Sequence, residues 1–124
     1  MAEPSRGRNV AAWIASGLLF LLFVGLTARM KLTSAQESVE AFQKYGYSDG
    51  FRMFIGTCEL LGGIALLIPR LATWSALGLF IIMLGALHAH LTHDEASRAV
   101  VPLVVALLLV FIGWVRRPQA LFLS

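Results

Sequence analysis

Four long apolar runs dominate this 124-residue sequence and limit what it can fold into. A helix needs about 20 predominantly apolar residues to cross a hydrocarbon core about 30 Å thick. Each run is too long for a strand, and the short alternating segments typical of a transmembrane β-barrel are absent from the sequence. We therefore predict an all-α integral membrane four-helix bundle, formed as a single domain over residues 1–124. The predicted spans cover residues 10–28, 51–69, 71–91 and 99–115.

The composition supports a membrane environment. Hydrophobic residues make up 58% of the chain and charged residues only 14%, so a soluble fold of this length would expose large apolar patches. Disorder, a disulfide-stapled scaffold and a zinc module are excluded, because the chain is apolar and Cys58 is its only cysteine. The net charge of +3 does not indicate nucleic acid, since the arginines lie at the ends of apolar runs. We expect the lipid bilayer, and no nucleic acid, as a partner.

The connections between the runs predict a compact bundle. Only Pro69 and Arg70 separate the second and third apolar runs, so the helices that these runs form should be antiparallel neighbours. Asp94, between the third and fourth spans, is the expected N-cap of the helix after it. The long connection over residues 29–50 is predicted to hold a short amphipathic helix that lies on the membrane surface or caps the bundle.

The basic residues bear on the orientation in the membrane. The first run follows Arg6 and Arg8, as in a signal peptide, but its length and the basic residues after it favour a retained helix. Four spans place both termini on one side, and the lysines and arginines divide equally, five to each side. If Arg52 and one of Arg29 and Lys31 lie inside the bundle, the excess predicts cytoplasmic termini in a bacterial-type inner membrane.

Glu59 is the charge that the composition does not explain, because it lies near the middle of the second span. A charged residue at the centre of a span costs roughly 2.5 to 3.5 kcal/mol. Small residues three or four positions away share its face and allow another helix to approach closely, so Glu59 should face protein rather than lipid. The glycines predicted to pack helices in the second and third spans are Gly56, Gly62, Gly63, Gly78 and Gly85.

Basic groups from three predicted helices could reach Glu59. Arg29 and Lys31 end the first span, Arg52 precedes Glu59 by seven residues, and His88 lies on an interior-looking face of the third span. Two interpretations are open. In the first, Glu59 is structural and stabilises helix contacts, as a member of an ion pair or as a protonated acid. In the second, Glu59 belongs to a polar site that binds a headgroup, quinone or small ligand, or that relays protons.

No catalytic or metal-binding residue is predicted. His88 and His90 are two positions apart and point to nearly opposite sides of a helix, which is a poor spacing for one metal ion. Cys58 has no C-x-x-C partner, so dithiol redox chemistry is not supported. The sequence contains no identifiable cofactor motif, and quinone is the one cofactor that we consider.

Short motifs spread over most of the chain form a recognisable pattern. They read RMKL at residues 29–32, FQKYGY at 42–47, GTCELLGG at 56–63 and LLIPR at 66–70. A further MLGA at residues 83–86 precedes His88, and Trp114 precedes two arginines. With the order of the spans, these motifs resemble the DoxX-like family over nearly the whole length. Ala28 departs from the pattern, since such sequences often carry glycine there.

The resemblance implies a small four-helix membrane protein. The family name comes from subunits linked to thiosulfate oxidation by quinone, some relatives join membrane oxidoreductase complexes that handle oxidative and thiol stress, and distant animal relatives assist receptor assembly. By the same resemblance, Lys31, Glu59, Arg70 and His88 occupy the polar positions of the motifs.

We predict an accessory membrane protein, without catalysis of its own, whose buried polar site around Glu59 binds a partner or a lipid-like ligand. The alternative is a quinone-linked membrane oxidoreductase subunit. No motif for flavin, haem or iron–sulfur is present, so its electrons would come from a partner protein. The other partner that we consider is a second copy of this chain, in a homo-oligomer. A transporter is less favoured, since inverted repeats and broken-helix pairs are absent from the sequence.

Overall fold

The computed structural model describes residues 4–93 and 95–122, and this part of the chain is helical and contains no strand. The all-α prediction is therefore confirmed. The elements are, in order, α1 (Arg6–Leu22), the π-helix η1 (Phe23–Thr27), α2 (Ala28–Leu32), α3 (Gln36–Lys44), α4 (Asp49–Ala65), α5 (Pro69–Thr92), the 3-10 helix η2 (Ala96–Ala99), α6 (Val100–Arg116) and the 3-10 helix η3 (Arg117–Gln119).

Three continuous helical segments are long and apolar enough to cross a membrane. They are Arg6–Leu32, Pro69–Thr92 and Ala96–Gln119. The chain is therefore a multi-pass integral membrane protein. The remaining predicted span corresponds to α4, which has 17 residues and carries both Arg52 and Glu59, so its length and composition do not by themselves identify it as a span.

Local signals in the sequence explain where the helices begin and end. The Ser5 and Ser48 hydroxyls accept hydrogen bonds from the backbone N–H groups of Arg8 and Phe51, as N-caps do. Pro69 occupies the first turn of α5, where its missing N–H costs little, so the short α4–α5 connection forms as predicted. The predicted cap Asp94 lies outside the described residues.

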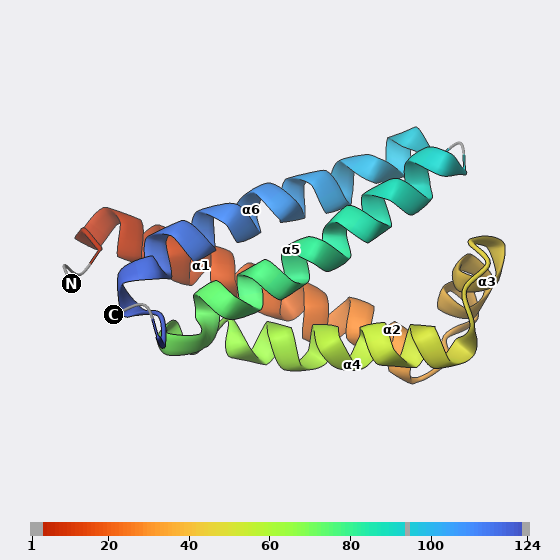
Figure 1. The fold of residues 1–124 in the computed structure, drawn as a ribbon, viewed down its shortest axis with the longest axis horizontal. Helices are drawn as coiled ribbons and strands as arrows, with labels where there is room; N and C mark the ends of the chain where they lie inside the picture. The colour runs from red at the N-terminus through yellow and green to blue at the C-terminus, as the bar shows by residue number, and fades with distance from the viewer. Residues whose placement is uncertain (1–3, 94, 123–124) are drawn as a thin grey trace.

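The long helices run lengthwise beside one another, with α3 lying across one end (Figure 1). At the opposite end, the start of α1 and the end of α6 meet, and an Arg116 guanidinium N–H donates to the Asn9 side-chain oxygen at 2.6 Å. The α4–α5 turn lies at this same end, since the Leu121 N–H donates to the Arg70 carbonyl at 2.9 Å. The amphipathic helix predicted within residues 29–50 is therefore the α3 cap of the other end.

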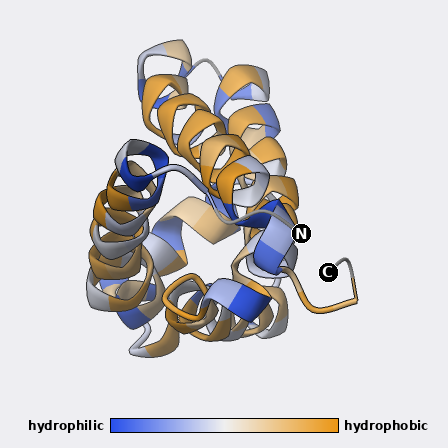
Figure 2. Cartoon of the chain, turned by 90° about the vertical axis from the view of Figure 1, so that its left-hand side faces the viewer, coloured by the Kyte–Doolittle hydropathy of each residue, from blue (hydrophilic) through white to orange (hydrophobic). Residues whose placement is uncertain are grey.

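Hydrophobic residues cover the outward faces of the long helices as well as the inward ones (Figure 2). Leu21, Leu61 and Leu107 are each more than 60% exposed, as expected for side chains that face lipid. Small residues such as Ala12 and Ala72 are fully buried where helices meet. This distribution is typical of membrane bundles, in which small residues line the interfaces and large ones face the hydrocarbon.

Three of the predicted packing glycines lie at close helix contacts. A Cβ atom added at Gly56 would lie 2.9 Å from Cβ of Lys31, and one added at Gly63 would lie 2.9 Å from a methyl group of Val24. Gly62 has a similarly close neighbour in α5. Because all three residues lie on α4, this helix approaches its neighbours on both sides of Glu59.

The prediction for Gly78 and Gly85 is wrong. No heavy atom lies within 4 Å of a Cβ atom added at either position. Gly78 borders an open apolar groove between α4 and α5, and Gly85 lines a cleft beneath α3. Small size alone does not specify contact, since these two glycines face open space where no helix of the chain lies against them.

Alanine substitutions should separate these two classes of glycine. We expect Gly63→Ala to lower the free energy of unfolding by about 1–3 kcal/mol, because the new methyl group would overlap Val24. Gly78→Ala should be neutral or stabilise by up to about 1 kcal/mol, because it replaces a mid-helix glycine in open space. Denaturant unfolding in mild detergent measures both, and equal stabilities would contradict the predicted contact.

Candidate functional site

An open cleft of about 520 Å³ lies between α2, α3, α4 and α5. Its volume falls in the range of roughly 300–1,000 Å³ that is usual for small-molecule sites. Most of its lining is apolar, and a few polar groups converge on it. The apolar lining includes Leu26, Met30, Ile55, Ile81, Ile82 and Met83.

Glu59 is the most deeply buried polar residue of the cleft, with 1% of the residue exposed. The Thr27 hydroxyl donates to its Oε2 atom at 3.1 Å. Nζ of Lys31 lies 2.7 Å from its Oε1 atom, and the Lys31 side chain is 17% exposed. The carboxylate thus faces protein, and the structure brings together Glu59 and Lys31 of the predicted site residues, together with Thr27.

The π-helix η1 places Thr27 beside Glu59. A π turn inserts an extra residue into a helix and rotates the residues after it, and such insertions are frequent at functional sites. Arg29 stabilises this irregular turn, because its Nε–H donates to the Gly25 carbonyl at 2.9 Å. Arg29 is exposed and makes this bond instead of pairing with Glu59. Gly25 is the one weak helix former in η1, and a single glycine within a span does not by itself predict a π turn, so the sequence analysis missed both η1 and Thr27.

Arg52 is 4% exposed and joins α4 to the end of α2. Its guanidinium donates to the Lys31 carbonyl and, at 3.2 Å, to the Ser34 hydroxyl. It also lies 3.4 Å from the Asp49 carboxylate. A cation at a helix C-terminus satisfies the carbonyl groups that have no partner in the helix. Arg52 therefore orders the α2 end that carries Lys31 rather than pairing with Glu59 itself.

The predicted interior position of His88 is wrong. His88 is exposed and shares the outward face of α5 with Leu84, four positions earlier. The inward face instead carries Met83 and His90, which are seven positions apart and both line the cleft. The error is one of helical phase, because the apolar sequence of α5 does not reveal which side faces protein.

A hydrogen-bonded cluster around Glu95 pins α3 across the mouth of the cleft. The Lys44 ammonium and the Tyr45 hydroxyl, both at the C-terminal end of α3, donate to Glu95 at 2.6 Å each. Nδ1 of His90 lies 3.0 Å from the same carboxylate, and Arg98 lies 3.6 Å away. The α5–α6 connection is thereby attached to α3. The sequence analysis assigned no role to this cluster.

The contacts shift the pKa values of two members of the cluster. Hydrogen bonds, first from Lys44 and then from Tyr45 and His90, lower the pKa of Glu95 to about 2. Burial and the hydrogen bond to Glu95 raise the pKa of Tyr45 to about 12. At neutral pH, Glu95 is therefore an anion and Tyr45 is a neutral hydrogen-bond donor.

Aromatic side chains border the cleft on its α3 and α4 sides. The ring centroid of Tyr47 lies 5.0 Å from that of Phe51 and 5.8 Å from that of Phe42. Nζ of Lys31 lies 5.9 Å from the Phe42 ring centroid. Flat apolar surfaces thus adjoin the Lys31–Glu59 pair. The density of aromatic residues between Phe42 and Phe51 is the sequence signal that could have indicated this wall.

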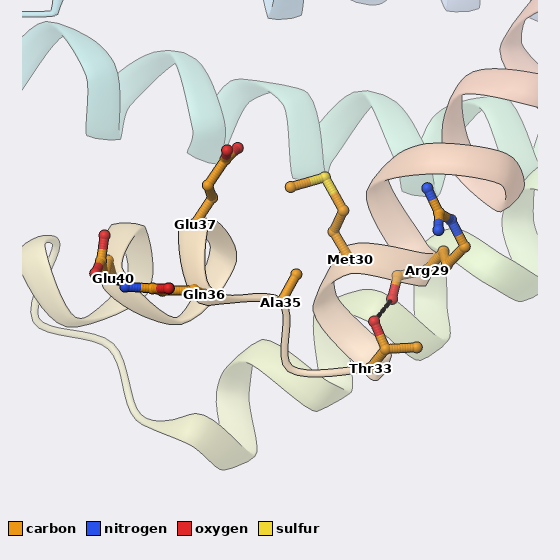
Figure 3. Close-up of a pocket in the computed structure, with 7 residues that line it drawn as sticks. All are labelled: Arg29, Met30, Thr33, Ala35, Gln36, Glu37 and Glu40. Atoms are coloured by element: carbon orange, nitrogen blue, oxygen red, sulfur yellow. Dashed lines mark hydrogen bonds between the residues drawn. The ribbon is translucent and has the colours of Figure 1, made fainter.

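A second depression, of about 560 Å³, lies at the α2–α3 junction (Figure 3). The Thr33 hydroxyl donates to the Arg29 carbonyl at 2.6 Å, and Gln36 donates to Glu40 at 2.9 Å. Figure 3 shows Glu37 and Met30 extending to the same side, and these two residues also line the cleft. The remaining polar groups bond locally on the surface and do not reach Glu59.

Arg116 is a buried cation that the sequence analysis treated as a membrane flank. It is 1% exposed, donates to Asn9 and Gln119 at 2.6 and 3.0 Å, and lies 5.0 Å from the Trp13 ring centroid. It joins α1 to α6 at the end of the molecule opposite α3. Within the described ranges, no group of three His, Cys, Asp or Glu side chains could hold a metal ion.

Residues 14–112 match the family model described as the DoxX-like family. The chain has no match among the curated proteins or the solved structures.

The Glu95 cluster predicts how the attachment of α3 depends on pH. Because folding lowers the pKa of Glu95 from 4.5 to about 2, its stabilising contribution is complete above about pH 4.5 and is lost as the pH falls through 2. Glu95→Gln should therefore increase amide hydrogen exchange in residues 36–44 at neutral pH. Lowering the pH through 2 should then loosen α3 less in this variant than in the wild-type protein. Glu40→Gln is the matched control, since Glu40 lies on α3 and bonds Gln36 instead. Equal exchange in the two variants would contradict this attachment.

Proposed function

This chain belongs to the DoxX-like family, and we propose that it is an accessory membrane protein that binds a lipid-like ligand in the cleft beneath α3. One observation carries the proposal, namely that a largely apolar cleft of about 520 Å³ leads to the buried Lys31–Glu59 pair. Pockets that combine apolar walls with a few convergent polar groups are typical of ligand sites. A purely structural ion pair would not require the adjoining open volume.

Quinone is the leading small molecule for this site. The rings of Phe42, Tyr47 and Phe51 offer flat apolar surfaces to a planar head, and the Lys31 ammonium offers a hydrogen-bond donor. The aliphatic wall formed by residues such as Ile55 and Ile81 suits a hydrocarbon tail. This donor set fits a quinone without a metal ion or a covalent link.

The alternative function is a quinone-linked membrane oxidoreductase subunit that works with a partner protein. It is favoured by the hydrogen-bonded side chains of Tyr45, His90 and Glu95 near the mouth of the cleft, since polar groups there offer hydrogen-bond partners for the oxygen atoms of a quinone head. In this function the chain would bind quinone and the partner would supply the electrons. We therefore do not propose catalysis by the chain alone. A homo-oligomer is the second candidate assembly.

We further propose that α4 is a fourth membrane span. Its first residue, Asp49, lies near α3, and its last turn leads to Arg70 at the opposite end, so the helix runs between the same two ends as α5 and α6. Seventeen residues extend about 26 Å, a little short of the hydrocarbon core. Its charges do not oppose this assignment, because Arg52 and Glu59 are buried against protein.

The distribution of exposed cations supports cytoplasmic termini. Five basic residues lie at the end that holds the termini, and four of them are left at the surface because Arg116 is buried. Five others lie at the α3 end, and three of them are left at the surface because Arg52 and Lys31 are held inside the bundle. The side with more lysine and arginine is favoured in the cytoplasm. We propose a bacterial-type inner membrane with both termini in the cytoplasm.

A tryptophan placed in the cleft tests ligand binding. Ala86 lines the cleft, so Ala86→Trp should fill it, whereas Leu84→Trp on the exposed face of the same helix should not. We expect lipid-like molecules, quinone included, to copurify with the wild-type protein and with Leu84→Trp, and to fall to background in Ala86→Trp. Mass spectrometry of organic extracts measures this, with thermal unfolding in detergent as the check on folding.

The result also decides between the functions. Equal recovery from both tryptophan variants would overturn the ligand-binding proposal. A copurifying oxidoreductase together with bound quinone would favour the alternative function. A homo-oligomer free of other proteins would count against the alternative and favour the accessory function.

Cysteine labelling tests the four-span topology. In a Cys58→Ala background, Glu40→Cys reports on the α3 end and Arg70→Cys on the α4–α5 turn, since both residues are exposed. With α4 spanning and cytoplasmic termini, a membrane-impermeant maleimide should label Glu40→Cys in intact bacterial cells and Arg70→Cys only after lysis. Labelling of both from one side would contradict the fourth span, and the reversed pattern would contradict the orientation.

A further inference from the structure

We infer that the end of the molecule opposite α3 holds a binding site for an anionic phospholipid, whose phosphate group contacts Arg8 and Arg117 beside the Trp114 ring. This end is formed by the start of α1 and the end of α6, which meet there (Figure 1). The cleft and its Lys31–Glu59 pair lie elsewhere, so the site is independent of the proposed ligand-binding function.

Two cations from separate elements gather at one aromatic ring. Arg8, in the first turn of α1, places its guanidinium carbon 5.2 Å from the Trp114 ring centroid. Arg117, the first residue of η3, places its guanidinium carbon 5.9 Å from the same centroid. Both arginines and the ring are exposed, so a ligand can reach them. Like charges held beside one ring repel each other, and an anion bound to both relieves this repulsion.

Both guanidinium groups keep hydrogen-bond donors for such an anion. Nε–H of Arg8 donates to the Ser5 hydroxyl at 3.2 Å, which orients the side chain and leaves its terminal N–H groups unused. Within the described residues, neither arginine forms a salt bridge, and the Arg117 side chain donates no hydrogen bond. A guanidinium over an aromatic face keeps N–H groups at its edge, where their spacing matches the oxygen atoms of a phosphate.

The joining of α1 to α6 does not require these two cations, because Arg116 performs it. Arg116 is 1% exposed and donates to the side chains of Asn9 and Gln119. Its guanidinium carbon also lies 5.0 Å from the ring centroid of Trp13 in α1. The two exposed arginines are therefore available to a ligand, while the buried one holds the helices together.

An apolar face of α6 continues from the ring. Leu107 and Val110 precede Trp114 by seven and four positions, so the three side chains lie on one side of the helix. Leu107 and Val110 are 63% and 54% exposed, on a surface that lipid covers. Tryptophan is enriched where such a surface meets the polar headgroups. A phospholipid matches both the arginines and this apolar face, whereas inorganic phosphate matches only the arginines.

Native mass spectrometry of the full chain in detergent measures the preference for an anionic lipid. The probes are dioleoylphosphatidylglycerol and dioleoylphosphatidylcholine, which share their acyl chains and phosphate, but choline balances the phosphate charge. We expect the wild-type protein to bind the phosphatidylglycerol about tenfold more tightly, as two arginines near a membrane surface would produce. In the double variant Arg8→Gln, Arg117→Gln the preference should fall to about twofold or less.

Matched variants separate a defined site from a general attraction to positive charge. The double variant Arg6→Gln, Arg70→Gln removes the same charge from the same end, and in the described part of the chain neither residue contacts an aromatic ring. It should keep the wild-type preference. Trp114→Leu should lower the preference, because the two guanidinium groups lose the ring that gathers them, and Trp74→Leu should not.

Four results would overturn the site. They are equal affinities of the wild-type protein for the two lipids, an equal loss of preference in the two double variants, an equal effect of the two tryptophan variants, and loss of the preference when millimolar inorganic phosphate is added at constant ionic strength. The last result would assign the arginines to free phosphate. Thermal unfolding checks that each variant folds. If the Arg8→Gln, Arg117→Gln protein does not, each single variant should show a reduced preference, and an unchanged preference in both would overturn the site.

Discussion

The burial of the Glu59 carboxylate is the constraint on which the other features of this protein depend. An uncompensated charge in a low-dielectric interior costs several kcal/mol, so the fold must bring a cation to it. Lys31 does so from α2, and Gly56 allows the approach, because any side chain there would overlap Cβ of Lys31. The π turn then adds the Thr27 hydroxyl.

The same requirement explains how a chain with few charges uses them. Arg52 bonds the carbonyl of Lys31 and so fixes the backbone that presents the ammonium to Glu59. At the opposite end, Arg116 joins α1 to α6 through Asn9. In hydrocarbon, apolar contacts distinguish poorly between a neighbouring helix and lipid, so these buried polar contacts specify which helices pair. The cleft lies where the packing is incomplete, beneath an α3 helix held by Glu95.

Much of the architecture could be predicted from the sequence, and less of the site. The apolar runs revealed the long helices, and the position of Glu59 among glycines revealed that it faces protein. The prediction for His88 was wrong because α5 is apolar on all sides, and such a helix gives no indication of its rotation. Thr27 was missed because the π turn that orients it is marked only by Gly25, and one glycine within a span does not by itself predict such a turn. The cluster around Glu95 joins residues 50 positions apart, beyond any local pattern.

The sequence by itself determined that this chain is helical, lies in a membrane and buries a carboxylate. The hydrophobicity and length of the apolar runs match the thickness of the bilayer, whichever helices become neighbours. Only the tertiary structure decided which cation meets Glu59, which glycines make contact and which histidine lines the cleft. These outcomes depend on the rotation of each helix about its axis. That rotation is determined by contacts between segments far apart in the chain, which uniform apolar surfaces do not encode.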